Sequence, residues 1–286
     1  MRLAILGFMT TLPTRRLAAA LVPLVWLLAT PVHAQFQPRR VSDPAVGEQY
    51  HIEFGADLWM PTADLVVASS GSGALSGIPG SEIDAKRDLG LTDKNLPQLH
   101  LVLRPAHSHK FRLDYIPIKY SQTATIQRNI DFNGQRYPLG IPVNSTLDWK
   151  AARISYEFDF VDKDRGYAGF IIEAKYTDVR VDLASPFTAE FARARAPIPA
   201  LGGIARVYVV NNAAITVEVT GFKIPDNIDN RYNAHYVDVD VYGTFNFMNN
   251  FGVRAGYRDL DLGYLIKQDS GSFTLKGVYV GLVVRY

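Results

Sequence analysis

The segment GVYVGLVVRY, residues 277–286, ends the chain and decides how the rest of the sequence is interpreted. A β-strand points successive side chains to opposite faces. Here the side chains on one face are Val278, Val280, Leu282, Val284 and Tyr286. That face is apolar to its last residue, whereas the ends of soluble chains are usually polar and frayed. The pattern predicts a strand that is held in place up to the end of the chain.

The other end of the chain is typical of a targeting segment. Three arginines precede an uncharged apolar run at 17–30, and Val32 and Ala34 stand at the −3 and −1 positions of a cleavage site. The run is shorter than the roughly 20 residues that a spanning helix needs, which disfavours a membrane anchor. We expect residues 1–34 to be a signal peptide for export through the Sec pathway, 35–47 a flexible periplasmic segment, and 48–286 the folded domain.

Composition excludes several classes of function. Without the three arginines of residues 1–34, the chain has 27 Lys and Arg against 28 Asp and Glu, so no basic surface points to nucleic acid. The sequence contains no cysteine, which excludes disulfides, thiol catalysis and cysteine metal sites. We expect no metal and no cofactor.

Short alternating segments fill the chain after residue 47. The clearest is AARISYEFDF at 151–160, and no later run approaches the 18 consecutive apolar residues of a spanning helix. With 12% aromatic residues, this pattern indicates either a transmembrane β-barrel or a secreted β-sandwich. Ten such segments can be counted. Eight or twelve would result if the stretch around FNG at 132–134, or the 204–222 hairpin, pairs differently.

Connection lengths favour the barrel. Long polar connections, the longest at 63–96 and 122–146, alternate with short turns such as VDKDRG and NNA. Outer-membrane barrels have this asymmetry, with long loops outside and short turns in the periplasm. Two irregularities are expected: a register slip near Pro117, and a one-residue shift at Arg258 that returns Leu260 to the lipid face. Residues 185–200 are expected to form a loop.

The last strand carries a resemblance to a known class. Its terminal aromatic residue and alternating apolar residues resemble those of small bacterial outer-membrane β-barrels of the OmpA and OmpW kind. The resemblance implies a closed antiparallel all-β barrel in the bacterial outer membrane. It also implies that the face from Val278 to Tyr286 is an assembly signal for the barrel-assembly machinery, and that outer-membrane lipid surrounds the barrel.

In such a barrel the charged faces of the strands must meet inside, because their apolar faces meet lipid. The inward charges form a mixed set: Arg104, Arg112, Asp114, Arg153, Glu157, Asp159, Glu173, Lys175, Arg206, Glu218, Asp238, Asp240, Arg254, Arg258 and Arg285. Charges of both signs can pair and fill a narrow lumen, and ten strands enclose little more than side chains. A plugged lumen is therefore favoured over a narrow porin that passes ions or small solutes.

Enzymatic alternatives lack a diagnostic motif. A protease of the omptin kind would need paired acids and an Asp–His pair near the outer rim; the candidates are Asp226, Asp229, His235, Asp259 and Asp261. His107 and His109 make a poor metal pair without carboxylates. His100 points inward alone, so no Ser–His triad is visible. We expect a structural barrel, not an enzyme, whose loops contact any extracellular ligand.

Overall fold

The computed structural model describes residues 45–71, 79–224, 232–266 and 268–286. Every regular element in these ranges is a β-strand. In the described part of the chain, no helix is long and apolar enough to cross a membrane.

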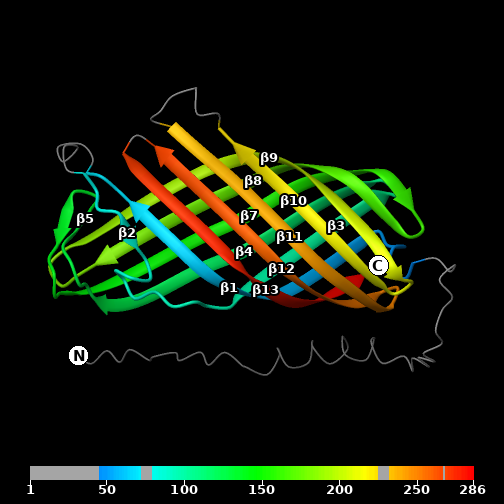
Figure 1. Ribbon diagram of the computed structural model, residues 1–286, viewed down its shortest axis with the longest axis horizontal. Coiled ribbons are helices and arrows are strands. Elements are labelled where there is room, and N and C mark those ends of the chain that lie inside the picture. Colours follow the sequence, from blue (N-terminus) through cyan, green and yellow to red (C-terminus); the bar gives the residue numbers. More distant parts are fainter. Residues whose placement is uncertain (1–44, 72–78, 225–231, 267) are drawn as a thin grey trace, which may run out of the picture. The chain divides into compact units, whose positions relative to one another are not determined.

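Ten long antiparallel strands form one closed barrel, as the sequence predicts (Figure 1). Each strand pairs with the next along the chain, and the first and last also pair, from Glu53 opposite Arg285 to Ala68 opposite Ser270. Closure leaves the wall without a free first or last strand. The ten strands are β1 (Ile52–Ala68), β3 (Leu96–Ala106), β4 (His109–Thr125), β7 (Pro142–Lys163), β8 (Gly166–Ala184), β9 (Ala189–Val210), β10 (Ala213–Lys223), β11 (Tyr232–Met248), β12 (Phe251–Ile266) and β13 (Asp269–Arg285).

The two ends of the barrel differ. At the end where the chain terminates, the connections are two-residue turns at 107–108, 164–165, 211–212 and 249–250. The opposite end, at the left of Figure 1, carries β2 (Ile83–Asp84) and a hairpin of β5 (Ile130–Phe132) and β6 (Gln135–Tyr137). Positive φ angles of 48° at Asn133 and 79° at Gly134 suit a tight hairpin turn, so the predicted hairpin tip at FNG is confirmed.

The side chains exchange faces halfway along the long strands. On β8, Phe170, Ile172 and Tyr176 point outward while Glu173 and Lys175 are buried inside. Further along the same strand the outward residues are Arg180 and Asp182, and the buried ones are Val179, Val181 and Leu183. We call the half with apolar outward side chains the belt, and the half beyond it, toward β2 and the hairpin, the collar.

This exchange of faces corrects the two predicted register shifts. The pairing of β4 with β7 is unbroken from His109 to Thr125, so there is no slip near Pro117. The pairing of β12 with β13 is likewise continuous, and Leu260 is buried inside at 2% exposure. Both predictions were wrong because the change of polarity marks the border between belt and collar, where the strand keeps its register but its surroundings change.

The predicted loop at 185–200 was also wrong. Only residues 185–188 connect β8 to β9, and Ala189 onward continues as strand. On β9, Arg193 and Arg195 point out of the collar, and the small residues Ala192 and Ala194 alternate with them. Alanine gives little hydrophobic contrast, which hides the alternation in the sequence.

Apolar side chains fill the interior of the collar. They form one cluster with the residues of β2, the hairpin and the connection between β2 and β3. Its largest members are almost fully buried: Trp59, Trp149, Tyr137, Tyr279, Phe132, Phe273, Ile83, Leu96, Ile118, Ile126 and Ile130. At Trp59 and Tyr279, which are paired across β1 and β13, the cluster reaches into the end of the belt. The collar is therefore a small soluble-type core that continues the barrel outside the belt.

Candidate functional site

The interior of the belt contains an ionic network. All fifteen charged residues that the sequence places inside are buried there, each exposing 9% or less of its surface. The buried interior of the described belt holds nine cations and nine carboxylates. The members that are additional to the fifteen are Glu53, Asp57 and Lys110.

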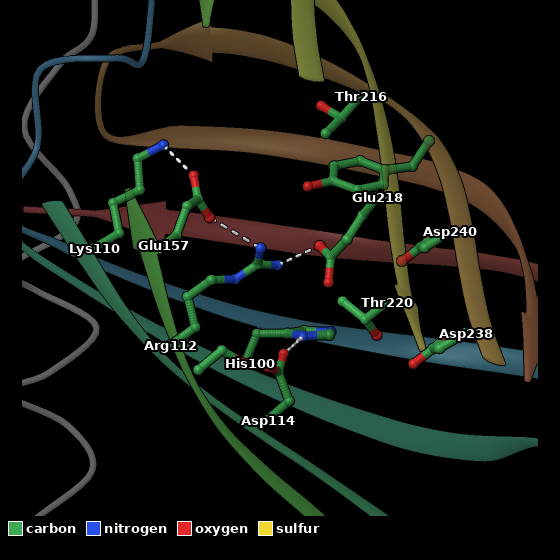
Figure 2. Close-up of polar contacts among 12 residues, drawn as sticks. His100, Lys110, Arg112, Asp114, Glu157, Thr216, Glu218, Thr220, Asp238 and Asp240 are labelled. Atoms are coloured by element: carbon green, nitrogen blue, oxygen red, sulfur yellow. Dashed lines mark hydrogen bonds and ion pairs between the residues drawn. The ribbon is translucent and has the colours of Figure 1, made fainter. Parts of the chain in front are cut away.

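One arm of the network crosses the barrel, as Figure 2 shows. Lys110 Nζ donates to Glu157 Oε1 at 2.6 Å. Glu157 Oε2 also accepts from Arg112 Nη1 at 3.0 Å, and Arg112 Nη2 reaches Glu218 Oε2 at 2.7 Å. These contacts join β4 and β7 to β10, which lies across the lumen from them (Figure 2).

A second arm centres on Asp238 of β11. Its carboxylate accepts two hydrogen bonds from Arg258, at 2.9 and 2.7 Å, a bidentate geometry that strengthens and orients the pair. Lys175 Nζ lies 3.2 Å from the same carboxylate, and Arg153 Nη1 lies 3.6 Å from it. Arg153 also contacts Glu218 at 3.0 Å, which connects the two arms.

His100 lies between two aspartates, which corrects the expectation that it points inward alone. Its Nε2 is 2.6 Å from Asp57 Oδ2, and its Nδ1 contacts Asp114 Oδ1. Both ring nitrogens therefore lie within hydrogen-bond distance of a carboxylate, and the imidazole of β3 joins β1 to β4 inside the barrel.

A glycine makes room for the pair that joins the first and last strands. Gly281 of β13 is in register with both Asp57 and Arg254, and a Cβ at this position would come within 1.8 Å of Asp57 Oδ1. Over this glycine, Arg254 Nε donates to Asp57 at 2.8 Å. The ion pair thus spans β13 and helps to close the barrel.

Residues 45–50 close the end of the barrel at which the chain terminates, which we call the inner end. Val46 is buried and its N–H donates to the carbonyl of Asn211 at 2.7 Å. Glu48 Oε1 accepts from Arg206 Nη1 at 2.8 Å and from the Tyr208 hydroxyl at 2.6 Å. Burial alone would raise the pKa of Glu48, but the charge of Arg206 and the Tyr208 hydrogen bond lower it to about 2. Residues 45–47, predicted to be flexible, are therefore held, while 1–44 lie outside the described residues.

The sequence missed several partners that complete this network. Glu48 lies outside any alternating segment. Lys110 lies on the same face of β4 as Arg112, but the sequence pattern assigned it to the turn PAHSHK at 105–110. Tyrosine hydroxyls also contribute: Tyr279 donates to Asp240 at 2.9 Å and Tyr236 to Asp238 at 2.8 Å. Their inward positions at period two were the available signal, but a tyrosine fits either face of a barrel.

The residues considered for enzyme chemistry do not converge on the lumen. His235 Nε2 lies 3.4 Å from Asp261 Oδ2, and both side chains are about two-fifths exposed on the outward face of the collar. Asp259, also outward, pairs with Lys276 at 3.3 Å. Asp226 and Asp229 lie outside the described residues.

The remaining histidines have separate surroundings. His107 accepts hydrogen bonds from Arg104 through its backbone carbonyl. His109 Nδ1 lies 2.6 Å from the hydroxyl of Tyr156. Within the described ranges, no group of three or more His, Cys, Asp or Glu residues could hold a metal ion.

Comparison with solved structures shows which known fold this architecture resembles. The outer membrane protease OmpT from Escherichia coli superposes with a TM-score of 0.54 at 6% identity, over 86% of this chain and 100% of that chain. The fold is that of a bacterial outer-membrane β-barrel. At 6% identity the similarity supports the fold alone, and a closer relation to barrels of the OmpA and OmpW kind stays a prediction.

Weaker similarities carry no further argument. The translocator domain of the autotransporter NalP from Neisseria meningitidis gives a TM-score of 0.36 at 9% identity, over 94% of this chain and 96% of that one. The toluene transporter TodX from Pseudomonas putida gives 0.34 at 10% identity, over 86% and 93%. No protein-family model and no curated protein sequence matches the chain.

Proposed function

We propose that this chain is a closed, non-conducting barrel of the bacterial outer membrane whose role is structural and is exerted at its surface. The observation that carries this proposal is that side chains fill the interior along both halves of the barrel. A paired ionic network occupies the belt, and an apolar core occupies the collar.

The belt network leaves little reason for ions to enter. Its buried carboxylates already have cations or hydroxyl donors within contact distance: Glu157 has Lys110 and Arg112, and Glu173 has Lys175 at 2.8 Å. A permeating ion would have to replace such contacts, and a ten-strand barrel has little space beyond its side chains. The network therefore favours a plug over a pore.

The collar adds a second barrier. The β5–β6 hairpin is attached to three parts of the wall: Asn133 N–H donates to Ser69 O at 2.9 Å, Asn133 Nδ2 to Glu190 at 3.1 Å, and Tyr137 OH to Leu183 O at 2.9 Å. Beside it, Arg128 Nη2 reaches Asp88 at 2.7 Å. Burial would raise the pKa of Asp88, but hydrogen bonds from Arg128 and Arg87 lower it. The β5–β6 hairpin is thus held against the wall of the collar by apolar and polar contacts together.

Single-channel recording of the refolded chain in a planar lipid bilayer tests the proposal. Inserted protein should be electrically silent. Discrete, reproducible conductance steps would instead support the narrow porin, and Asp238→Asn and Arg254→Gln should then change its ion selectivity.

A non-enzymatic role is part of the same proposal. It is supported by the position of His235 and Asp261 on the outward face of the collar, away from any enclosed site. Peptide or lipid cleavage by the purified chain that disappears in His235→Ala would contradict it.

We also propose that the outward face of β13 is read by the barrel-assembly machinery. Tyr286 is 85% exposed, while its backbone N–H donates to the carbonyl of Ile52 at 2.8 Å. The ring is therefore not needed to hold the strand end in place. Tyr286→Ala should slow assembly in cells several-fold while leaving the unfolding of the purified barrel nearly unchanged.

A further inference from the structure

The wall of the collar has a notch between β1 and β4, because β3 is only 11 residues long. The pairing of β3 with β4 ends at Leu99 opposite Tyr115, and its pairing with β1 ends at Leu96 opposite Trp59. β4 has 17 residues and continues beyond this point, paired on its other side with β7. From Ile116 onward no described strand pairs with β4 on the side of β3. β4 therefore has a free edge within the wall of the collar.

Two prolines set the base of the notch. The N–H of Arg104 on β3 donates to the carbonyl of His51, so the even-numbered residues of β3 face β1 and the odd-numbered ones face β4. Continued by two residues, the register of β3 and β4 would place Pro97 opposite Pro117. Neither proline has an N–H to donate, so the ladder cannot continue at this pair. The sequence itself therefore ends the pairing of β3 with β4.

Beyond this proline pair, the backbone of β4 directs its hydrogen-bonding groups alternately to β7 and to the notch. The carbonyl of Gln122 accepts from Ser145 Oγ of β7 at 3.1 Å, so the even-numbered residues of β4 face β7. The N–H and C=O groups of Lys119, Ser121 and Thr123 consequently face the notch. Among the described residues, no backbone hydrogen bond to these groups is formed across the notch. The free edge thus offers donors and acceptors in the spacing of a strand.

The opposite edge of the notch, on β1, is already covered by the chain that leads into β3. Ala63 N–H donates to Asp93 Oδ1 at 2.9 Å, and the carbonyl of Leu65 accepts from Ala85 N–H at 2.9 Å. These contacts attach the covering segment to β1 and leave the edge of β4 as the unpaired side.

A pocket of about 210 Å³ adjoins the free edge, lined by residues 91–94 of the covering segment and 119–121 of β4. The outward side chains of β4 along this edge are exposed. Charges of both signs lie nearby, since Lys119 stands opposite Asp148 of β7, so the surroundings favour neither an anion nor a cation. Recognition at this edge therefore depends on the backbone.

An extended polypeptide has the complementary groups, because a strand added to an edge pairs its own N–H and C=O groups with those of the edge. A second copy of the barrel in the same membrane cannot supply them in this way. Strands tilted by about 40° in two barrels related by a rotation about the membrane normal would cross at about 80°, instead of lying antiparallel. A segment of a different polypeptide at the outer surface has no such restriction.

We propose that the edge of β4 from Lys119 to Thr123 binds an extended segment of an extracellular polypeptide by strand addition. Uncharged β-branched side chains suit the added strand beside Ser121 and Thr123, because such residues pair well across strands. The inference specifies the partner for the surface role proposed above and rests on that proposal.

Titration with the dye-labelled peptide acetyl-Thr-Val-Thr-Val-Thr-Val-Thr-amide tests this inference on the refolded chain in neutral detergent. We expect saturable binding whose affinity changes less than about twofold between 0.05 and 0.5 M salt, because no charge is recognised. At saturation, hydrogen exchange at the N–H groups of Lys119 and Ser121 should slow at least about threefold, whereas exchange at Gln122, which faces β7, should not change. The same peptide with every amide N-methylated should not bind, because it has no N–H to donate.

Ser121→Pro removes one donor of the edge but keeps the pairing with β7, as Pro117 does on the same strand. It should weaken binding about fivefold. Ser121→Ala is the matched control, since it removes the hydroxyl and keeps the N–H, and it should leave the affinity unchanged.

Equal affinity of these two variants would overturn the proposal, and so would binding of the N-methylated peptide or binding without slower exchange at Lys119 and Ser121. The N-methylated peptide is tested on the unaltered chain, so that result does not depend on the folding of a variant. Since these titrations need no bilayer, their failure is distinguishable from conductance, which would refute the closed barrel.

Discussion

The belt and the collar are built from the same strands in opposite ways. On β13, Leu282 faces outward and Arg285 inward in the belt, whereas Lys276 faces outward and Leu275 inward in the collar. In the belt the outside solvent is lipid, so apolar groups belong outside and the polar interior must satisfy itself. In the collar the outside solvent is water, and the ordinary rule of an apolar interior returns. One unbroken strand register serves both.

The stability of the belt should depend on complete charge pairing. Asp238→Leu leaves Arg258, Lys175 and Arg153 without their shared carboxylate, and breaking a buried pair from one side costs about 3–5 kcal/mol. We expect a loss of about 4 kcal/mol in the free energy of unfolding, measured by guanidinium titration in detergent.

The double variant Asp238→Leu with Arg258→Leu is the control for that experiment. Replacing both partners by apolar groups removes the uncompensated charge, so it should recover part of the loss. A double variant less stable than Asp238→Leu would show that the network does not act through charge balance.

The collar should respond as a soluble core does. Leu275 is fully buried among apolar side chains, and Leu275→Ala should cost about 3 kcal/mol through lost burial and the cavity left behind. The same guanidinium titration measures it. An unchanged unfolding free energy would mean that the collar opens independently before the belt unfolds.

The sequence predicted the belt well and the collar poorly. In the belt, residues such as Ile154 and Phe158 alternate with Arg153 and Glu157, and the large contrast in polarity identifies both strand and face. The collar keeps the alternation but reverses its meaning, so Leu260 was assigned to the lipid face when it lies inside. Nothing in the local pattern states which solvent surrounds a strand. A row of tyrosines followed by outward lysines and aspartates was the available signal.

Partner assignments within the network could not be predicted at all. Charge signs and faces follow from each strand alone, but the contact of Arg112 with Glu218 depends on how far β4 and β10 are turned around the barrel. The position of Glu48 depends on a segment without periodicity that folds back into the barrel end. Such contacts are properties of the closed structure.

A single substitution on each half of β13 tests the exchange of faces directly. Leu282 lies at the middle of the lipid-facing row, where an arginine costs about 2–4 kcal/mol. Leu282→Arg should therefore destabilise the barrel in lipid vesicles by about 2–3 kcal/mol. Ser272→Arg, on the same face of the same strand but in the collar, should change the unfolding free energy by less than about 0.5 kcal/mol. Similar losses for the two variants would contradict the border between belt and collar.

The smallest effect concerns the inner end of the belt and depends on pH. The pKa of Glu48 is about 2 in the folded chain against an ordinary 4.5, so its ionised form stabilises the fold. That contribution is complete above pH 4.5 and is lost as the pH falls from 4.5 toward 2. Hydrogen exchange at the N–H of Val46 should accelerate over this window, beyond its intrinsic pH dependence. Glu48→Gln should exchange faster at pH 7, by about fivefold for a loss of about 1 kcal/mol, and show no such window. A variant that keeps the acid transition would mean that another group attaches residues 45–50 to the barrel.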